Sequence, residues 1–410
     1  MSKIKSIIAK EIKDSRGKST IECFVETDKG EFFACVPSGV STGKNEALEL
    51  RDADGKGVLV AIKNVNEIIA PKLRGRDVLN QTEIDKLMID LDGTENKSKL
   101  GANAILSVSM AVARAGAACK KISLYKHIAE LSNNSAKLFI PLPMFNILNG
   151  GAHAKNDLDI QEFMIVPQKK TIQENLVLCN SVFNKLQEAI KTSFGENHLD
   201  LGDEGGFAPP ISSAERALFL LKGACEGQDD VRFALDSAAS EFFDTSAGSV
   251  GKYNVDGQEL TRSQMIKFYK NLAREFPIIS FEDPFAEEDW EGFKEFTKEM
   301  PDKIIIGDDL TTTNIKRIKE AHNKSAINGV LIKLNQIGTL SETLEAINMT
   351  KSFGWKVAVS HRSGETMDDF IADLAVGAGA DFLKAGSPAK EERMVKYTRL
   401  IQIEKELNKK

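Results

Sequence analysis

The chain has 410 residues, of which 42% are hydrophobic and 28% are charged, and it carries a net charge of −6. This composition excludes a disordered protein, and the length favours two domains with a sizeable core. A negative chain without a basic cluster is not expected to bind nucleic acid.

The cysteines and apolar segments indicate where the protein resides. Five cysteines are scattered and never spaced as CxxC, which predicts free thiols in a reducing compartment. The charged first 14 residues do not resemble a signal peptide. The most apolar segment, Leu100–Ala113, is too short to span a bilayer and predicts a buried helix. We therefore expect a cytoplasmic protein with no membrane span.

Residues 1–135 predict an α+β domain. Alternating apolar residues separated by turn signals predict a three-stranded meander. Its expected strands are Lys5–Ile12, Thr20–Thr27 and Glu31–Val36. Helical periodicity follows, including an amphipathic stretch from Val58 to Ile69 that Pro71 is expected to end and another that Gly93 is expected to end.

The loop Pro37–Lys44, PSGVSTGK, is rich in glycine and serine. It is not a Walker A phosphate loop, because Gly39 and Gly43 are one residue too close and Asn45 follows Lys44. We expect a mobile lid over a site in the other domain; a plain interdomain loop is the alternative.

Residues 136–410 predict an eight-stranded β/α barrel. Short apolar runs alternate with helix-like segments, and several runs end in ionisable residues. Those runs are Arg232–Ser237, Pro277–Phe285, Lys303–Asp309, Gly329–Asn335 and Trp355–Arg362. The active sites of such barrels lie at the carboxyl ends of the strands. The segment Lys252–Leu260, with Asp256-Gly257 at its turn, predicts a surface hairpin inserted between two strands.

Three carboxylates, Asp236, Glu282 and Asp308, follow three of these strands. Each alone would be read as a helix N-cap. Converging on one barrel mouth, they would repel one another unless a cation held them, and Mg²⁺ prefers such oxygen ligands. The sequence therefore predicts a magnesium site.

Other polar residues are candidates for binding and proton transfer. Lys333 interrupts an apolar strand, and beside a dication its pKa should fall, as a general base requires. Lys384 is either a salt-bridge partner or a receptor for an anionic group. The segment SHRSGE combines His361, Arg362 and Ser363 as an anion-binding set. Glycine-flanked loops and a strand start present the last candidates: Glu204, His153 and Glu162.

Nine blocks of the chain, in order, closely resemble the enolase family. They are PSGVSTGKNEALELRD (37–52), FNILNGGAH (145–153), QEFMIVP (161–167), GDEGGFAP (202–209), ALDSAASEF (234–242), FEDPF (281–285), GDDLTTTN (307–314), LIKLNQIGTL (331–340) and SHRSGET (360–366). The resemblance implies an N-terminal α+β domain and a C-terminal barrel in which one early strand is antiparallel. It also implies Mg²⁺-dependent, reversible dehydration of 2-phosphoglycerate to phosphoenolpyruvate by a homodimer or higher homo-oligomer.

The resemblance further implies a role for each site residue. Lys333 removes the C2 proton and Glu204 protonates the departing C3 hydroxyl. Glu162, His153 and His361 complete the acid and hydrogen-bonding network. Arg362 and Ser363 take the phosphate and Lys384 the carboxylate. The first Mg²⁺ is held by Asp236, Glu282 and Asp308, and Ser41 on the lid helps to bind a second.

The chain departs from the usual enolase pattern at a few positions, namely Lys18-Ser19, Met367, Asp369-Phe370 and Ala385. None of these changes removes a proposed catalytic group. Two alternatives stay open from the sequence: an acid-sugar dehydratase or cycloisomerase of the same superfamily, and a non-catalytic structural or adhesive protein on the same fold.

Overall fold

The computed structural model describes residues 2–39, 43–244 and 251–409. The chain begins with an antiparallel sheet in the order β1-β2-β3. Its strands are β1 (Ser6–Lys13), β2 (Ser19–Thr27) and β3 (Gly30–Cys35). The predicted meander is thus confirmed. Alternating residues of β2 (Ile21, Cys23 and Val25) are fully buried, and this face packs on helix α4.

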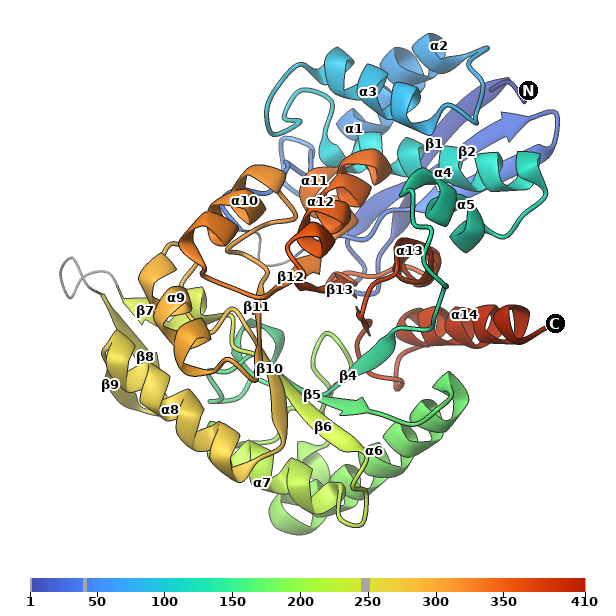
Figure 1. The fold of residues 1–410 in the computed structure, drawn as a ribbon. Helices are drawn as coiled ribbons and strands as arrows, with labels where there is room; N and C mark the ends of the chain where they lie inside the picture. Colours follow the sequence, from blue (N-terminus) through green and yellow to red (C-terminus); the bar gives the residue numbers. More distant parts are fainter. Residues whose placement is uncertain (1, 40–42, 245–250, 410) are drawn as a thin grey trace.

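A group of helices follows the meander and lies with it on one side of the molecule (Figure 1). These elements are α1 (Leu59–Lys63), the π-helical turn η1 (Asn64–Ile69), α2 (Ala70–Leu73), α3 (Gln81–Asp92), α4 (Ala102–Lys120) and α5 (Leu124–Leu131). Gly93 adopts φ +71° and ends α3 as predicted. The prediction that Pro71 ends its helix is wrong, because the chain stays helical to Leu73. Pro71 stands in the first turn of α2, where its missing N–H is tolerated.

Helix α4 is the buried helix that the sequence predicts. It is long and apolar enough to cross a membrane by length and composition alone. However, 83% of its most apolar window is buried inside the fold, as in the core helix of a globular protein. Its apolar surface is therefore covered by the chain itself.

The second half of the chain forms a closed eight-stranded barrel. Its strands are, in order around the barrel, β4 (Leu142–Asn149), β5 (Glu162–Pro167), β6 (Val231–Asp236), β10 (Ile278–Glu282), β11 (Ile304–Gly307), β12 (Gly329–Ile332), β13 (Lys356–Ser360) and β14 (Phe382–Lys384). Strand β5 is antiparallel to both neighbours, whereas the other pairs are parallel. The expected barrel and its antiparallel early strand are both confirmed.

Helices and short helical turns connect the strands. The α-helices are α6 (Ile172–Phe194), α7 (Ala214–Ala224), α8 (Arg262–Glu275), α9 (Trp290–Glu299), α10 (Ile315–Lys324), α11 (Leu334–Ile337), α12 (Leu340–Ser352), α13 (Phe370–Ala378) and α14 (Glu391–Asn408). The 3₁₀ turns are η2 (Gly151–His153), η3 (Glu196–His198) and η4 (Ala239–Phe242). The predicted hairpin is confirmed as β8 (Lys252–Val255) and β9 (Gln258–Leu260), and β8 also pairs with β7 (Phe243–Asp244).

Apolar side chains fill the inside of the barrel. They come from seven of its strands and form a cluster separate from the main core: Met144, Met164, Val166, Ala234, Ile306, Leu331, Ala358 and Phe382. A barrel of this kind is a packed core rather than a pore. The charged side chains Glu162, Asp236, Glu282 and Lys384 stand at the ends of its strands.

The N-terminal elements contact the barrel beside that rim. Helix α13 packs on α5, and Arg114 of α4 pairs with Asp368 at 2.6 Å and with Asp369 at 3.0 Å. Asp369 is one of the departures from the family pattern, and here it belongs to this contact between the two parts of the chain. Met367, beside it, is 58% exposed, and nothing in the structure explains its choice.

Candidate active site

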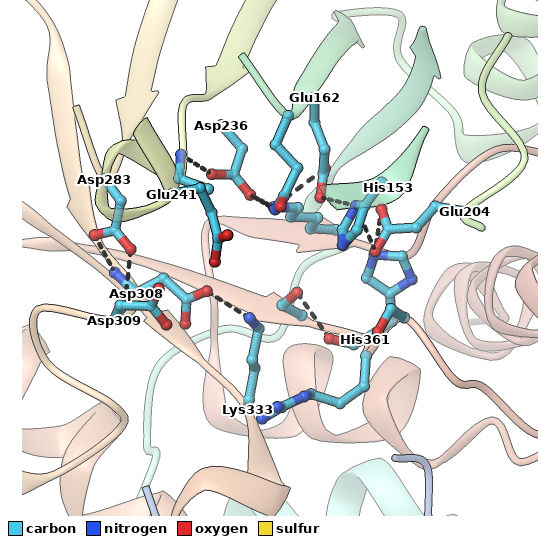
Figure 2. Close-up of a pocket in the computed structure, with 16 residues that line it drawn as sticks. His153, Glu162, Glu204, Asp236, Glu241, Asp283, Asp308, Asp309, Lys333 and His361 are labelled. Atoms are coloured by element: carbon cyan, nitrogen blue, oxygen red, sulfur yellow. Dashed lines mark hydrogen bonds and ion pairs between the residues drawn. The ribbon is translucent and has the colours of Figure 1, made fainter. Parts of the chain in front are cut away.

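A pocket opens at the barrel rim, where the predicted residues meet (Figure 2). Its lining includes ten of the predicted residues: His153, Glu162, Glu204, Asp236, Asp308, Lys333, His361, Arg362, Ser363 and Lys384. Glu282 is buried directly beside them and contacts Lys384. Ser41 lies outside the described residues. The pocket walls carry seven carboxyl groups and three permanently basic side chains, so they favour an added cation.

Strand register explains why three carboxylates stand side by side. Asp236 ends β6 and pairs in register with Glu282, which ends β10. On its other side Asp236 pairs with Glu162, the first residue of β5. Because β5 runs against its neighbours, its first residue reaches the rim where the parallel strands end. Glu162, Asp236 and Glu282 therefore form one row across three strands.

Lys384, the last residue of β14, places its ammonium group among these carboxylates. Its Nζ lies 2.9 Å from Asp236 Oδ2, 2.9 Å from both Glu282 oxygens and 3.2 Å from Glu162 Oε2. Burial lowers the pKa of Lys384, but the three carboxylates outweigh burial and raise it well above its ordinary value. The sequence left two roles open for this residue, and in this structure it is a salt-bridge partner.

Asp308 stands apart from the row. Glu282 is in register with Ile306, so Asp308 lies two residues further along its strand. One oxygen of Asp308 contacts Lys333 Nζ at 2.5 Å, and the other accepts from Gln336 Nε2 at 2.8 Å. Burial lowers the pKa of Lys333, but Asp308 and Glu282 together bring the pKa above its ordinary value. The expected fall in the pKa of Lys333 beside a dication stays a prediction; in this structure the neighbour of its ammonium group is a carboxylate.

Two further acids support this corner of the pocket. Asp283 accepts hydrogen bonds from the backbone N–H groups of Asp308 (3.0 Å) and Asp309 (2.7 Å), and so fixes the turn after β11. Burial and the charge of Asp308 raise the pKa of Asp309 to about 8. Neither residue was among the predicted metal ligands.

The donor chemistry of the pocket fits a hard divalent cation. Among the described residues, two groups of three side chains hold their ligand atoms within 4.8 Å of one another: His153, Glu162 and Glu204, and Asp283, Asp308 and Asp309. The predicted trio is not such a group, because the ammonium group of Lys384 contacts Asp236 and Glu282 while Lys333 contacts Asp308. Burial and the charge of Asp236 raise the pKa of Glu282 well above its ordinary value, against the opposing effect of Lys384. These acidic clusters could hold a metal ion.

A second cluster lies on the other side of Lys384. Nδ1 of His153 is 3.6 Å from Glu162 Oε1 and 3.8 Å from Glu204 Oε1, so one ring nitrogen faces both carboxyl groups. Asn146 Nδ2 donates to Glu204 Oε2 at 3.1 Å. Burial and the charge of Glu204 raise the pKa of Glu162. Burial also acts to raise the pKa of Glu204, but His361 and His153 outweigh it and lower that pKa. Of the two carboxyl groups, Glu162 is therefore the one that more readily carries a proton.

The anion-binding set is in place at the end of β13. Arg362 is buried, and its Nη1 contacts Glu46 of the N-terminal part at 2.8 Å. Glu46 also accepts from Gln336 Nε2 at 3.3 Å. Glu46, Gln336 and Asn146 were not predicted as site residues, because nothing in the sequence around them indicates a site. The Arg362 guanidinium thus has a carboxylate partner in this structure.

The loop Pro37–Lys44 is described only at its two ends, because residues 40–42 lie outside the described residues. Ser38 forms a backbone bridge with Gly364 of the barrel. Lys44 pairs with Glu287 at 3.0 Å. Both described ends therefore contact the barrel, and closure of a lid stays a prediction.

The fold and the site together define a β/α-barrel protein with an acidic pocket at the carboxyl ends of its strands. Residues 137–410 match the family model "Enolase, C-terminal TIM barrel domain", and residues 4–128 match "Enolase, N-terminal domain". The chain belongs to the enolase family.

Curated relatives match along nearly the whole chain. The enolase of Methanocaldococcus jannaschii is 50% identical, over 98% of this chain and 95% of its own. Enolase B of Dictyostelium discoideum is 49% identical, over 99% and 95% of the two chains. Enolase 1 of Entamoeba histolytica is 48% identical, over 98% and 96%. This full-length similarity disfavours both the acid-sugar enzyme and the non-catalytic protein as alternatives.

Proposed function

We propose that this chain catalyses the reversible dehydration of 2-phosphoglycerate to phosphoenolpyruvate, with Lys333 as the base and Glu204 as the acid. Membership of the enolase family makes the chain a carbon–oxygen lyase. The observation that supports the residue roles is their convergence: a lysine, two neighbouring glutamates and an arginine line one acidic pocket (Figure 2).

Lys333 is the proposed base for the C2 proton. It lies at the end of β12 and, among the described residues, makes its ion pair with Asp308. That pairing keeps the ammonium group protonated in this structure, because Asp308 raises the pKa of Lys333. Lys333 can accept a proton only after its own has left, so the charge of Asp308 must be engaged elsewhere during the reaction.

Mg²⁺ is the proposed partner for that charge. Asp236, Glu282 and Asp308 would hold the first ion, and Ser41 would contribute to a second one. Bound there, Mg²⁺ would supply electrostatic stabilisation of the extra negative charge that forms on the substrate carboxylate. Arg362 and Ser363 would bind the phosphate, and Lys384 would bind the carboxylate.

Glu204 is the proposed acid for the C3 hydroxyl. Glu162 is the more readily protonated of the two, because burial and the charge of Glu204 raise its pKa. His153 faces both carboxyl groups with one ring nitrogen. We propose that the proton passes to Glu204 within this cluster before it reaches the departing hydroxyl, so Glu162 serves as the proton reserve.

The wider assignments also remain proposals. We place the domain boundary between residues 135 and 136, after α5 and before β4. All five cysteines are free, which supports a reducing, cytoplasmic location. A homodimer or higher homo-oligomer is supported by exposed apolar side chains on the outer face of the meander, where Ile8 is 59% and Phe33 49% exposed.

An absorbance assay for phosphoenolpyruvate tests the proposal. Purified protein with 2-phosphoglycerate and Mg²⁺ should form product, and chelation of divalent ions with EDTA should abolish it until Mg²⁺ is restored. If no phosphoenolpyruvate forms while substituted acid sugars turn over, the proposed substrate is wrong.

A further inference from the structure

We propose that Arg393 is a positioning residue whose guanidinium holds His361 in the tautomer that directs its ring proton at Glu204. The proposal rests on the acid role proposed for Glu204. Arg393 lies in the first turns of α14, in the charged segment EERMVK, and its side chain is fully buried behind the pocket.

The contacts of Arg393 join the two loops that form the acid side of the site. Nη1 lies 2.6 Å from His361 Nδ1 and donates to the carbonyl oxygen of Arg362 at 2.6 Å. Nη2 donates to the carbonyl oxygens of Ser363 (2.7 Å) and Asp203 (3.4 Å). One guanidinium therefore binds the loop that carries the proposed phosphate ligands and the loop that carries Glu204.

The chemistry of arginine decides which nitrogen of His361 carries the proton. A guanidinium has N–H donors, no acceptor, and stays charged in proteins. His361 Nδ1 must therefore act as the acceptor, so it is unprotonated and the ring is neutral. The single ring proton is on Nε2, which lies 3.3 Å from Glu204 Oε2. His361 Nε2 thus faces the proposed acid as a neutral N–H group, close to Glu204 but outside hydrogen-bond geometry in this structure.

The charged groups around the ring agree with this arrangement. Burial, together with the charge of Arg393, lowers the pKa of His361 to about 4 against the opposing effects of Glu204 and Glu365. The imidazolium form is consequently absent at neutral pH. A neutral imidazole is too weak an acid to protonate Glu204, so His361 serves only to orient it. The proposed proton source for Glu204 is therefore Glu162, beside His153.

The test is nuclear magnetic resonance of ¹⁵N-histidine-labelled full-length protein, with His361→Asn used to assign the signal. We expect an unprotonated Nδ1 and a protonated Nε2 in the wild type from pH 8 to pH 5. Finding Nδ1 protonated, or a cationic ring at pH 7, overturns the proposal without any need for an Arg393 variant. This readout does not depend on turnover, so it fails or succeeds separately from the proposed function.

Arg393→Met then tests whether the arginine is the cause. The pKa of the His361 ring should rise above its wild-type value in this variant, and kcat should fall about 10²-fold, as for other losses of geometry at a reacting centre. Activity should also decline with falling pH as the ring protonates, a limb that the wild type lacks. The control is Arg399→Met on the same helix, which removes the pair with Asp373. An unchanged ring titration in Arg393→Met, or the same change in both variants, contradicts the proposal.

Discussion

The ammonium nitrogen of Lys384 lies 2.9 Å from both carboxylate oxygens of Glu282. The lysine thus occupies the space beside a proposed metal ligand in this structure. A metal ion that uses Glu282 and Asp236 must displace the lysine from them, because both carboxylates now contact its Nζ. Release of Lys384 toward the substrate and binding of the cation are therefore expected to be linked.

Lys384→Met should tighten the first magnesium site in the absence of substrate. The three carboxylates around Lys384 would lose their internal cation, so their attraction for Mg²⁺ should rise by about tenfold or more. Without metal the variant should be less stable, since removing one partner of a buried pair costs about 3–5 kcal/mol. Calorimetric titration and thermal unfolding with and without Mg²⁺ measure both effects.

Lys396→Met is the matched control for that experiment. Lys396 is equally buried and pairs with Glu365 at 2.6 Å, away from the acidic row. It should lose stability without gaining affinity for Mg²⁺. Equal Mg²⁺ affinities in the wild type and Lys384→Met would show that the lysine does not compete with the metal.

His127 should make the N-terminal helices sensitive to acid. It is fully buried in α5, and neither ring nitrogen has a hydrogen-bond partner among the described residues. Burial lowers the pKa of His127 to about 4, below that of the unfolded chain, so stability is present above pH 6.5 and is lost as the pH falls toward 4. Between pH 7 and pH 5 this amounts to about 2 kcal/mol.

His127→Leu should remove that component of the pH dependence. Denaturant unfolding of the variant and the wild type at pH 7 and pH 5 measures the difference directly. The wild type should lose about 2 kcal/mol more than the variant across this range. Parallel losses in the two proteins would mean that His127 is not the responsible group.

Asp256 should act in the opposite direction. Both of its carboxylate oxygens lie 3.0 Å from the backbone nitrogen of Ala214, and its own backbone N–H donates to Asp159 at 2.7 Å. Burial, with the nearby charge of Asp159, raises the pKa of Asp256 to about 6. A raised carboxyl pKa favours the protonated folded state, so stability falls as the pH rises from about 4 to 6.

Asp256→Asn should therefore stabilise the protein at pH 8 by about 1 kcal/mol, reduced from the full linkage value because the group is only half-buried. The gain should disappear below about pH 4. Asp229→Asn serves as the control, because Asp229 is exposed and follows the end of α7, the helix that begins at Ala214. Its substitution should change the stability little. A gain that persists at pH 4 would point to a cause other than the charge of Asp256.

The sequence predicts the barrel and its rim because strand ends recur with a regular period. Asp236, Glu282, Asp308 and Lys333 each follow an apolar run, and such positions converge in any barrel. Arg393 escapes this reasoning, because it lies in a charged helix whose pattern resembles a solvated surface. Its role depends on which loops the helix touches, and that is a tertiary contact.

The sequence likewise does not predict which charged side chains pair with one another in the pocket. Lys333 and Lys384 each follow a strand, and local pattern does not say which carboxylate either will contact. The strand register decides the pairing. Asp308 lies beyond the row formed by Glu162, Asp236 and Glu282, so Lys333 contacts Asp308 and Lys384 contacts the row. The continuation of helix through Pro71 also depends on a π-helical turn that periodicity does not reveal.

Exchange of the C2 proton of 2-phosphoglycerate with solvent deuterium tests the central claim, the separation of base and acid. Glu204→Gln should retain most of the exchange while forming little phosphoenolpyruvate, because Lys333 is intact. Lys333→Ala should lose exchange by roughly 10²–10⁴-fold, the usual contribution of a general base. Equal exchange rates in the two variants, measured by proton resonance in deuterated buffer, would contradict the assignment of Lys333 as base and Glu204 as acid.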